Sequence, residues 1–249
     1  MQEVAPGPEL QEDPPPSASA SAPTSWRTVT WLEIASVIVS ILITTWAIVP
    51  FQLPQKWLAS IPGLLALGLI INSHRVRGES RRDLGFTTRH FTAALRLLLW
   101  PTLIACATLI LIGALNDSFH RTNRFWSTLI YLPFWGTLQQ YVLQGFVYRR
   151  VRSLLVDESL PPQKIRQQIE MSVIVTPLIF GFVHLPNLTL SLLTFLGGLT
   201  WSWVYERAPN LFVLGLSHAM MSFLLMSSSP PWLLDSMSVG YKHFLYQKF

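Results

Sequence analysis

Several polar side chains lie inside apolar segments of this 249-residue chain, at spacings that could support chemistry. Imidazole groups can act as a base, an acid or a metal ligand near neutral pH, whereas amides and hydroxyls exchange hydrogen bonds without changing charge. Polar side chains are costly in the centre of a bilayer and usually face the interior of a helical bundle, so they are candidates for a functional site. The candidate site residues are Gln139, Gln140, Gln144, His184, His218 and Ser222.

The spacing of these residues predicts which of them share a helix face. Gln140 and Gln144 are four residues apart and share a face, and Gln139 lies about 100° around the helix from Gln140. His184 stands just before a proline, and His218 stands one helical turn before a serine. Each residue taken alone could serve as an interhelical hydrogen bond worth roughly 0.6 to 2 kcal/mol. Two histidines and three glutamines on three segments favour one shared polar site.

The elements that must position these residues are membrane helices. Half of the residues are hydrophobic and 12% are charged, and the mean hydropathy is +0.38, which lies outside the composition of ordinary soluble proteins. A membrane-spanning helix needs about 20 mostly apolar residues. We therefore predict an all-α fold, a multi-pass membrane helical bundle of about seven to eight transmembrane helices. The apolar runs cover about 28–52, 57–73, 91–115, 125–148, 171–186, 188–205 and 210–227.

The rest of the sequence predicts three regions of the chain and the orientation of the protein in the membrane. Residues 1–26 form a disordered tail rich in Pro, Ala and Ser, residues 27–227 form the transmembrane domain, and residues 228–249 form an amphipathic interfacial segment. Basic residues gather in two connections, which predicts that both connections and the N-terminus are cytoplasmic in an integral protein of the cell or inner membrane. Because they form no single stripe, we expect membrane lipid and a peptide or protein as partners, and no nucleic acid.

The order of the three polar groups resembles the CAAX-protease and bacteriocin-processing (CPBP, Abi) family of intramembrane endopeptidases, over about residues 84–226. The family motifs are Glu-Glu-x-x-x-Arg-Gly, Phe-x-x-x-His and His-x-x-x-Asn. This chain has QQYVLQG, FGFVH and HAMMS in the same order. The resemblance implies a bundle of about eight helices around a water-filled cavity. In that cavity a glutamate and a histidine activate water for peptide hydrolysis, and the last motif steadies the oxyanion.

The glutamines change what this motif can do. A neutral amide cannot take a proton from water, so neither Gln139 nor Gln140 can replace the glutamate as a general base. Gln144 replaces the expected arginine, so the motif loses its positive charge together with the negative charges of the two glutamates. The sequence therefore leaves two main hypotheses. One is an endopeptidase with an altered site, and the other is a catalytically silent relative that binds a peptide, a lipid or a partner membrane protein. A small transporter is a weaker third, because the chain has no inverted repeat.

Catalysis could be retained in two ways. His184 and His218 could act alone, or could hold a divalent metal such as zinc with Gln140 or Ser222 as weak further ligands. Alternatively, Glu33, Glu170 or Glu206 could supply the missing acid, although each lies near a helix end. The predicted helix ends raise one geometric conflict. A fourth helix ending at residue 149 and a fifth starting near 171 would place the glutamines and His184 at opposite membrane depths.

Overall fold

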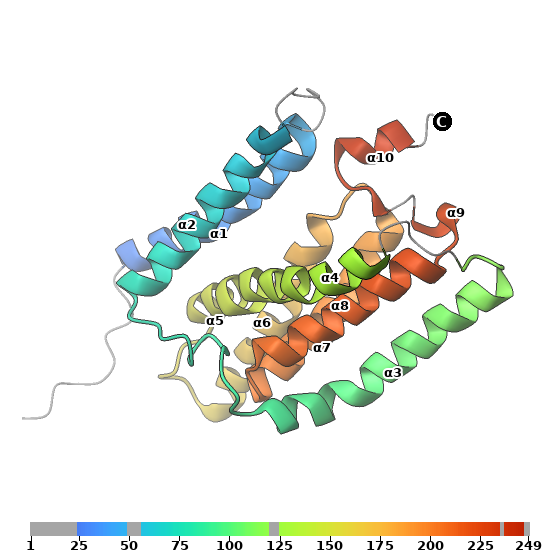
Figure 1. Cartoon of the computed structure of the whole chain (residues 1–249). Helices are drawn as coiled ribbons and strands as arrows, with labels where there is room; N and C mark the ends of the chain where they lie inside the picture. The colour runs from blue at the N-terminus through green and yellow to red at the C-terminus, as the bar shows by residue number, and fades with distance from the viewer. Residues whose placement is uncertain (1–23, 49–55, 120–124, 235–236, 247–249) are drawn as a thin grey trace, which may run out of the picture.

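The computed structural model describes residues 24–48, 56–119, 125–234 and 237–246, and within these ranges the chain is helical and contains no strand (Figure 1). The predicted all-α fold is therefore confirmed. In chain order the elements are α1 (Thr24–Leu42), the π-helix η1 (Ile43–Ile48), the 3-10 helix η2 (Lys56–Ser60), α2 (Ile61–Val76), α3 (Phe91–Leu115), α4 (Phe125–Gln140), the π-helix η3 (Tyr141–Tyr148), α5 (Arg149–Leu155), α6 (Pro162–Phe182), α7 (Leu188–Arg207), α8 (Leu211–Ser228), α9 (Pro231–Leu234) and α10 (Tyr241–Tyr246).

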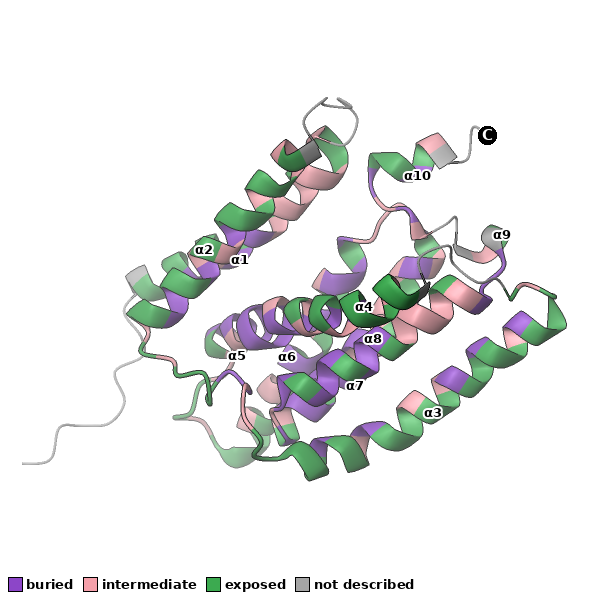
Figure 2. Ribbon diagram, viewed as in Figure 1, coloured by how far each residue is buried: buried purple, intermediate pink, exposed green. Residues whose placement is uncertain are grey.

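Five of the described helical segments are long and apolar enough to cross a membrane. They are Trp26–Ile48, Trp57–Val76, Phe91–Leu115, Leu188–Arg207 and Leu211–Ser228. Large apolar side chains stand on the outer surface, as along α3, where exposed residues alternate with buried ones (Figure 2). Such an apolar exterior suits contact with the hydrocarbon core of a membrane, whereas soluble proteins rarely expose large apolar patches to water. The chain is a multi-pass helical membrane protein.

The helices pack as a bundle with a separate hairpin at its side. α4 packs against α8, α6 against α7, and α3 against α8, while α1 and α2 pack against each other. In Figure 1 the α1–α2 hairpin runs beside the bundle, and α3 lies on the far side of α8. The central contacts include Phe146, Val204, Leu211 and Leu214, all fully or nearly fully buried. This arrangement leaves α4 and the helix that follows it between α8 and the hairpin.

The predicted ends of the fourth and fifth helices were wrong. α4, η3 and α5 follow one another without a break from residue 125 to 155, so Gln140 lies near the middle of this helical stretch. α6 starts at Pro162 rather than near 171, with Pro at its first position, where a missing N–H costs nothing. Its first turns carry the exposed Arg166–Glu170 pair, and hydropathy misses such a polar extension. The predicted conflict in depth between the glutamines and His184 came from these wrong helix ends.

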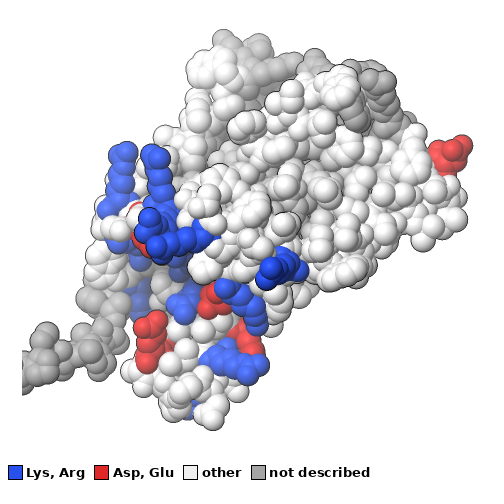
Figure 3. All heavy atoms as spheres, turned by 60° about the horizontal axis from the view of Figure 1, so that its bottom comes forward, with Lys and Arg blue, Asp and Glu red and all other residues white. Residues whose placement is uncertain are grey.

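Charged side chains gather at one end of the bundle (Figure 3). The buried guanidinium of Arg150 is the centre of this ion cluster: its Nη2 lies 2.7 Å from Oε2 of Glu79 and its Nε lies 3.3 Å from Oε2 of Glu33. Glu79 also accepts hydrogen bonds from Arg149, at 2.7 and 2.9 Å, and Arg77 binds Glu33 at 2.8 Å. The cluster joins α1, the loop after α2 and α5, so it ties the α1–α2 hairpin to the bundle.

The ion cluster makes stability depend on pH through Glu79. Burial raises the pKa of this carboxyl, but hydrogen bonds from His74, Arg150 and Arg149 outweigh burial and hold the pKa well below its ordinary value of 4.5. Because the folded pKa is the lower one, the stabilising contribution is complete above pH 4.5 and is lost as the pH falls from there toward the folded pKa.

We therefore expect the melting-temperature difference between wild type and Glu79→Gln to be large near neutral pH and to narrow below pH 4.5. The reason is that a protonated Glu79 and a glutamine are both neutral. Thermal unfolding in detergent across this pH range measures the difference. A gap of constant size at all pH values would show that the Glu79 charge does not stabilise the fold.

Candidate functional site

The glutamine pair of the central helix reaches across to two neighbouring helices. Gln140 and Gln144 have no solvent exposure, as their predicted shared face requires. The Gln140 amide nitrogen lies 3.1 Å from Nδ1 of His218 on α8. The Gln144 amide lies within hydrogen-bonding distance of the Ser202 hydroxyl on α7 through both of its polar atoms, at 3.0 and 3.2 Å. The Gln144 amide is therefore satisfied by a neutral partner through both polar atoms, whereas Gln140 has a neutral partner for its nitrogen and a buried amide oxygen without one.

Close backbone contact brings α4 and α8 together at this point. A Cβ added to Gly136 would lie 2.6 Å from the carbonyl oxygen of Gly215, and one added to Gly215 would lie 2.7 Å from Cα of Thr137. Small residues let membrane helices approach closely. Gln140 follows Gly136 by one turn and His218 follows Gly215 by about one turn, so the glycine contact sets the distance between the amide and the imidazole.

We predict that Gly215→Ala forces α8 away from α4 and costs about 1–3 kcal/mol of stability, as expected for overpacking. Gly68→Ala on α2 is the matched control, because a Cβ there meets nothing within 4 Å and alanine is the better helix former. Thermal unfolding in detergent should show a lower melting temperature for the first variant and an unchanged or higher one for the second. Equal melting temperatures of the two variants would mean that α4 and α8 can move apart at little cost in stability.

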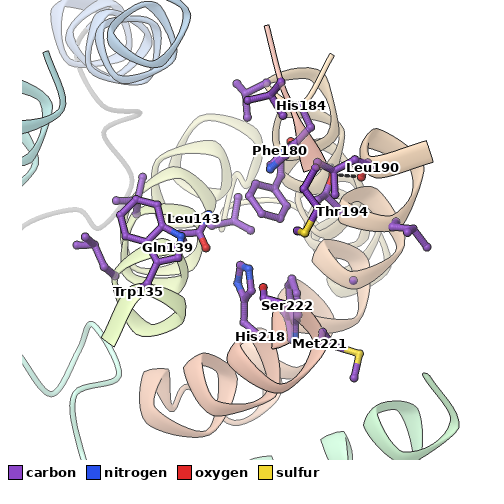
Figure 4. A pocket seen from close by; sticks show the side chains of 18 of the residues that line it. Trp135, Gln139, Leu143, Phe180, His184, Leu190, Thr194, His218, Met221 and Ser222 are labelled. Atoms are coloured by element: carbon purple, nitrogen blue, oxygen red, sulfur yellow. Dashed lines mark hydrogen bonds between the residues drawn. The ribbon is translucent and has the colours of Figure 1, made fainter. Parts of the chain in front are cut away.

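The two histidines are held in different ways. The ring of His218 stacks on Trp201, with centroids 4.5 Å apart and an interplanar angle of 12°, and Trp201 donates to Ser217 at 3.2 Å. Nδ1 of His184 lies 2.6 Å from the carbonyl oxygen of Phe180. The ring of Phe180 packs edge-on against both imidazoles, with centroids 4.8 Å from His184 and 6.1 Å from His218. In Figure 4 Phe180 lies between the two histidines.

A cavity of about 1210 Å³ lies between the α1–α2 hairpin and the bundle, with walls from α3, α4, α6, α7 and α8. Four of the six predicted site residues line it: Gln139, His184, His218 and Ser222 (Figure 4). The other two, Gln140 and Gln144, do not line it. They lie behind its wall, in the contacts with α8 and α7. The structure thus gathers the predicted residues in one region and assigns them two different positions.

None of the acids proposed as substitutes reaches this cavity. Glu33 belongs to the ion cluster, Glu206 accepts from Tyr148 at 2.6 Å and pairs with Arg152, and Glu170 pairs with Arg166 at the exposed start of α6. The cavity walls among the described residues contain no Asp, Glu, Lys or Arg.

The donor set at the cavity does not fit a metal site. The described residues hold no group of three or more His, Cys, Asp and Glu side chains that could bind an ion. The two imidazoles, separated by Phe180, would have to be completed by amide or hydroxyl oxygens. Zinc sites in proteins take three or four strong ligands such as imidazole, thiolate or carboxylate.

Three residues of this region were not anticipated from the sequence. Ser202 satisfies Gln144, Trp201 stacks on His218, and Ser217 lies 3.0 Å from the hydroxyl of Thr102 on α3 while accepting from Trp201. The one available signal was the polar Ser202 in the apolar run LTWSWVYE. Its helical phase points toward the bundle, but a single serine in a membrane helix is common and gives no partner.

This geometry defines a class of protein. It is a helical membrane protein whose cavity is lined by residues of the second and third motifs. Residues 121–224, which include all six candidate site residues, match the family described as type II CAAX prenyl endopeptidase Rce1-like. This match confirms, over residues 121–224, the resemblance to the CAAX-protease (CPBP) family that the order of the motifs indicated. No curated protein and no solved structure matches the chain.

Proposed function

We propose that this protein is a catalytically silent member of its family, which holds a peptide or lipid segment in its membrane cavity without hydrolysing it. The observation that carries the proposal is the contact between the Gln140 amide and Nδ1 of His218. At this place the family motif has a carboxylate, and here a neutral donor occupies the imidazole nitrogen.

Hydrolysis of a peptide bond needs a group that takes a proton from water. An amide cannot do this, and loss of general base catalysis typically costs about 10²–10⁴-fold in rate. Gln139, the amide that does face the cavity, has the same limitation. The residue in place of the family arginine is also neutral, because Gln144 is paired with Ser202 behind the cavity wall. These neutral pairs support a site that binds and does not activate water.

An altered endopeptidase is the second candidate, and His184 favours it. Its Nδ1 must donate to the Phe180 carbonyl, which can only accept, so its Nε2 carries a lone pair at the cavity wall. A neutral imidazole of this kind can act as a general base. In that case His184→Ala would abolish hydrolysis, whereas a binding protein has no hydrolysis to lose.

The orientation proposed for the protein follows from its charges. The ion cluster brings the connection after α2, which is rich in basic residues, and the basic residues of α5 together, and Figure 3 shows Lys and Arg gathered at one end of the molecule. Lys and Arg gather on the cytoplasmic side of membrane proteins. We place this end and the start of α1 in the cytoplasm, with membrane lipid and a peptide or protein as partners and no nucleic acid.

The binding function is tested with a farnesylated peptide and a leader-type peptide, both with an amidated C-terminus, added to the protein in nanodiscs. We expect at least one of them to be retained and recovered uncut, and Ser222→Phe to abolish retention because Ser222 lines the cavity. Ala107→Phe is the matched control, since Ala107 is exposed on α3 and does not line the cavity. Retention of neither peptide, or equal retention by both variants, would contradict a cavity-binding function.

A further inference from the structure

The charge of the cavity walls limits what the cavity can hold. Among the described residues that line the cavity, His184 and His218 carry the only imidazoles, and the lining contains no carboxylate, ammonium or guanidinium. A charged group moved from water into such a place loses its hydration and gains no counter-charge, which is costly. The buried guanidinium of Arg150, in the ion cluster outside this lining, is already paired with Glu33 and Glu79. A ligand with a carboxylate would therefore be unpaired inside this cavity.

Hydrogen-bonding groups on the same walls specify the polar part of a ligand. Nδ1 of His184 donates to the Phe180 carbonyl, which leaves Nε2 as an acceptor. Nδ1 of His218 accepts from the Gln140 amide nitrogen, which leaves Nε2–H as a donor. The Gln139 amide adds one further group of each kind at the wall. These acceptors and donors are all uncharged and complement an amide or a hydroxyl.

The remaining walls suit a long apolar chain. Apolar residues of the hairpin face apolar residues of the bundle across the cavity, among them Leu64, Leu67, Ile112 and Leu193. The volume of about 1210 Å³ exceeds the roughly 300–1,000 Å³ of sites for drug-sized ligands. The space beyond the polar groups is therefore both large and lipid-like.

We propose that the cavity selects an uncharged amphiphile, a long apolar chain with an amide- or hydroxyl-type head, and rejects the same molecule when its head is a carboxylate. This selectivity rests on the binding function proposed above and names the class of ligand for it. It also separates this chain from a site built for a free C-terminal carboxylate, which would need a cation facing the cavity, whereas no Lys or Arg is among the described residues that line it.

The test compares two probes that share one acyl chain, N-oleoylglycinamide and N-oleoylglycine, in equilibrium binding to the protein in nanodiscs near neutral pH. We expect the amide to bind about tenfold more tightly or better, a difference large enough to measure reliably by native mass spectrometry. Empty nanodiscs correct for partition into lipid. Equal binding of both probes, tighter binding of the acid, or no binding of either would overturn the proposal.

A charge introduced at the wall gives the second arm. Gln139→Lys should reverse the preference toward the acid, whereas Gln167→Lys, the same change at an exposed position of α6 outside the cavity, should leave it unchanged. Peptide hydrolysis measured on the same preparations separates the two claims. If the protein hydrolyses peptides and still prefers the amide probe, only the proposal that it is catalytically silent is contradicted. If it neither hydrolyses peptides nor prefers the amide probe, only the proposed class of ligand is contradicted.

Discussion

The triple variant Gln139→Glu/Gln140→Glu/Gln144→Arg is expected to hydrolyse peptides that the wild-type protein leaves intact. The change returns a carboxylate to the cavity wall at position 139 and a second one beside His218 at position 140. A positioned general base contributes about 10²–10⁴-fold in rate. We therefore expect activity of the triple variant to exceed that of wild type by about this factor, measured as peptide cleavage in nanodiscs by mass spectrometry.

The arginine is needed because carboxylates without a counter-charge are costly in a buried place. The double variant Gln139→Glu/Gln140→Glu serves as the control, and we expect it to be less stable and less active than the triple variant. Adding His218→Ala to the triple variant should remove the gained activity. A triple variant that folds, as shown by an unchanged elution profile and melting curve, and still cuts nothing would mean that the scaffold has lost more than its charges.

Arg150→Ala is expected to be the most destabilising single substitution in this protein. The guanidinium is 2% exposed and lies between the carboxylates of Glu33 and Glu79. Its removal leaves two partly buried negative charges with fewer partners, and breaking a buried pair in this way costs about 3–5 kcal/mol. Thermal unfolding in detergent should show a large loss of melting temperature.

Arg166→Ala provides the comparison, because it removes an arginine of the same kind from an exposed pair with Glu170 four residues along α6. Such pairs contribute about 0.3–0.5 kcal/mol, so this variant should melt close to wild type. If the two variants melted alike, the ion cluster would not be what holds the α1–α2 hairpin. Since that hairpin forms one wall of the cavity, Arg150→Ala should also weaken ligand retention.

The sequence was sufficient to predict the class of fold and which of the candidate glutamines share a helix face. Apolar runs of sufficient length predict membrane helices, and four-residue spacing placed Gln140 and Gln144 on one face, which the structure confirms by their complete burial. Gln139, about 100° away by helical geometry, faces the cavity instead. These predictions succeeded because they depend on the local geometry of a single helix.

Features that depend on contacts between distant segments could not be predicted. The partner of Gln144 is Ser202, 58 residues away, and the approach of α4 to α8 depends on Gly136 and Gly215 meeting backbone to backbone. Neither residue type signals its partner in the sequence. Helix ends at the membrane surface were also missed, since hydropathy detects the apolar part of α6 and not its polar first turns.

We propose that a neutral amide beside His218 leaves this protein without hydrolytic activity. The most direct test is to incubate the purified wild-type protein in nanodiscs with farnesylated and leader-type peptides and to follow products by mass spectrometry beside His184→Ala. We expect the wild-type protein to form no product above the background of that variant. Product formed by wild type and lost in His184→Ala would contradict it, and would show that the cavity imidazoles catalyse hydrolysis without a carboxylate.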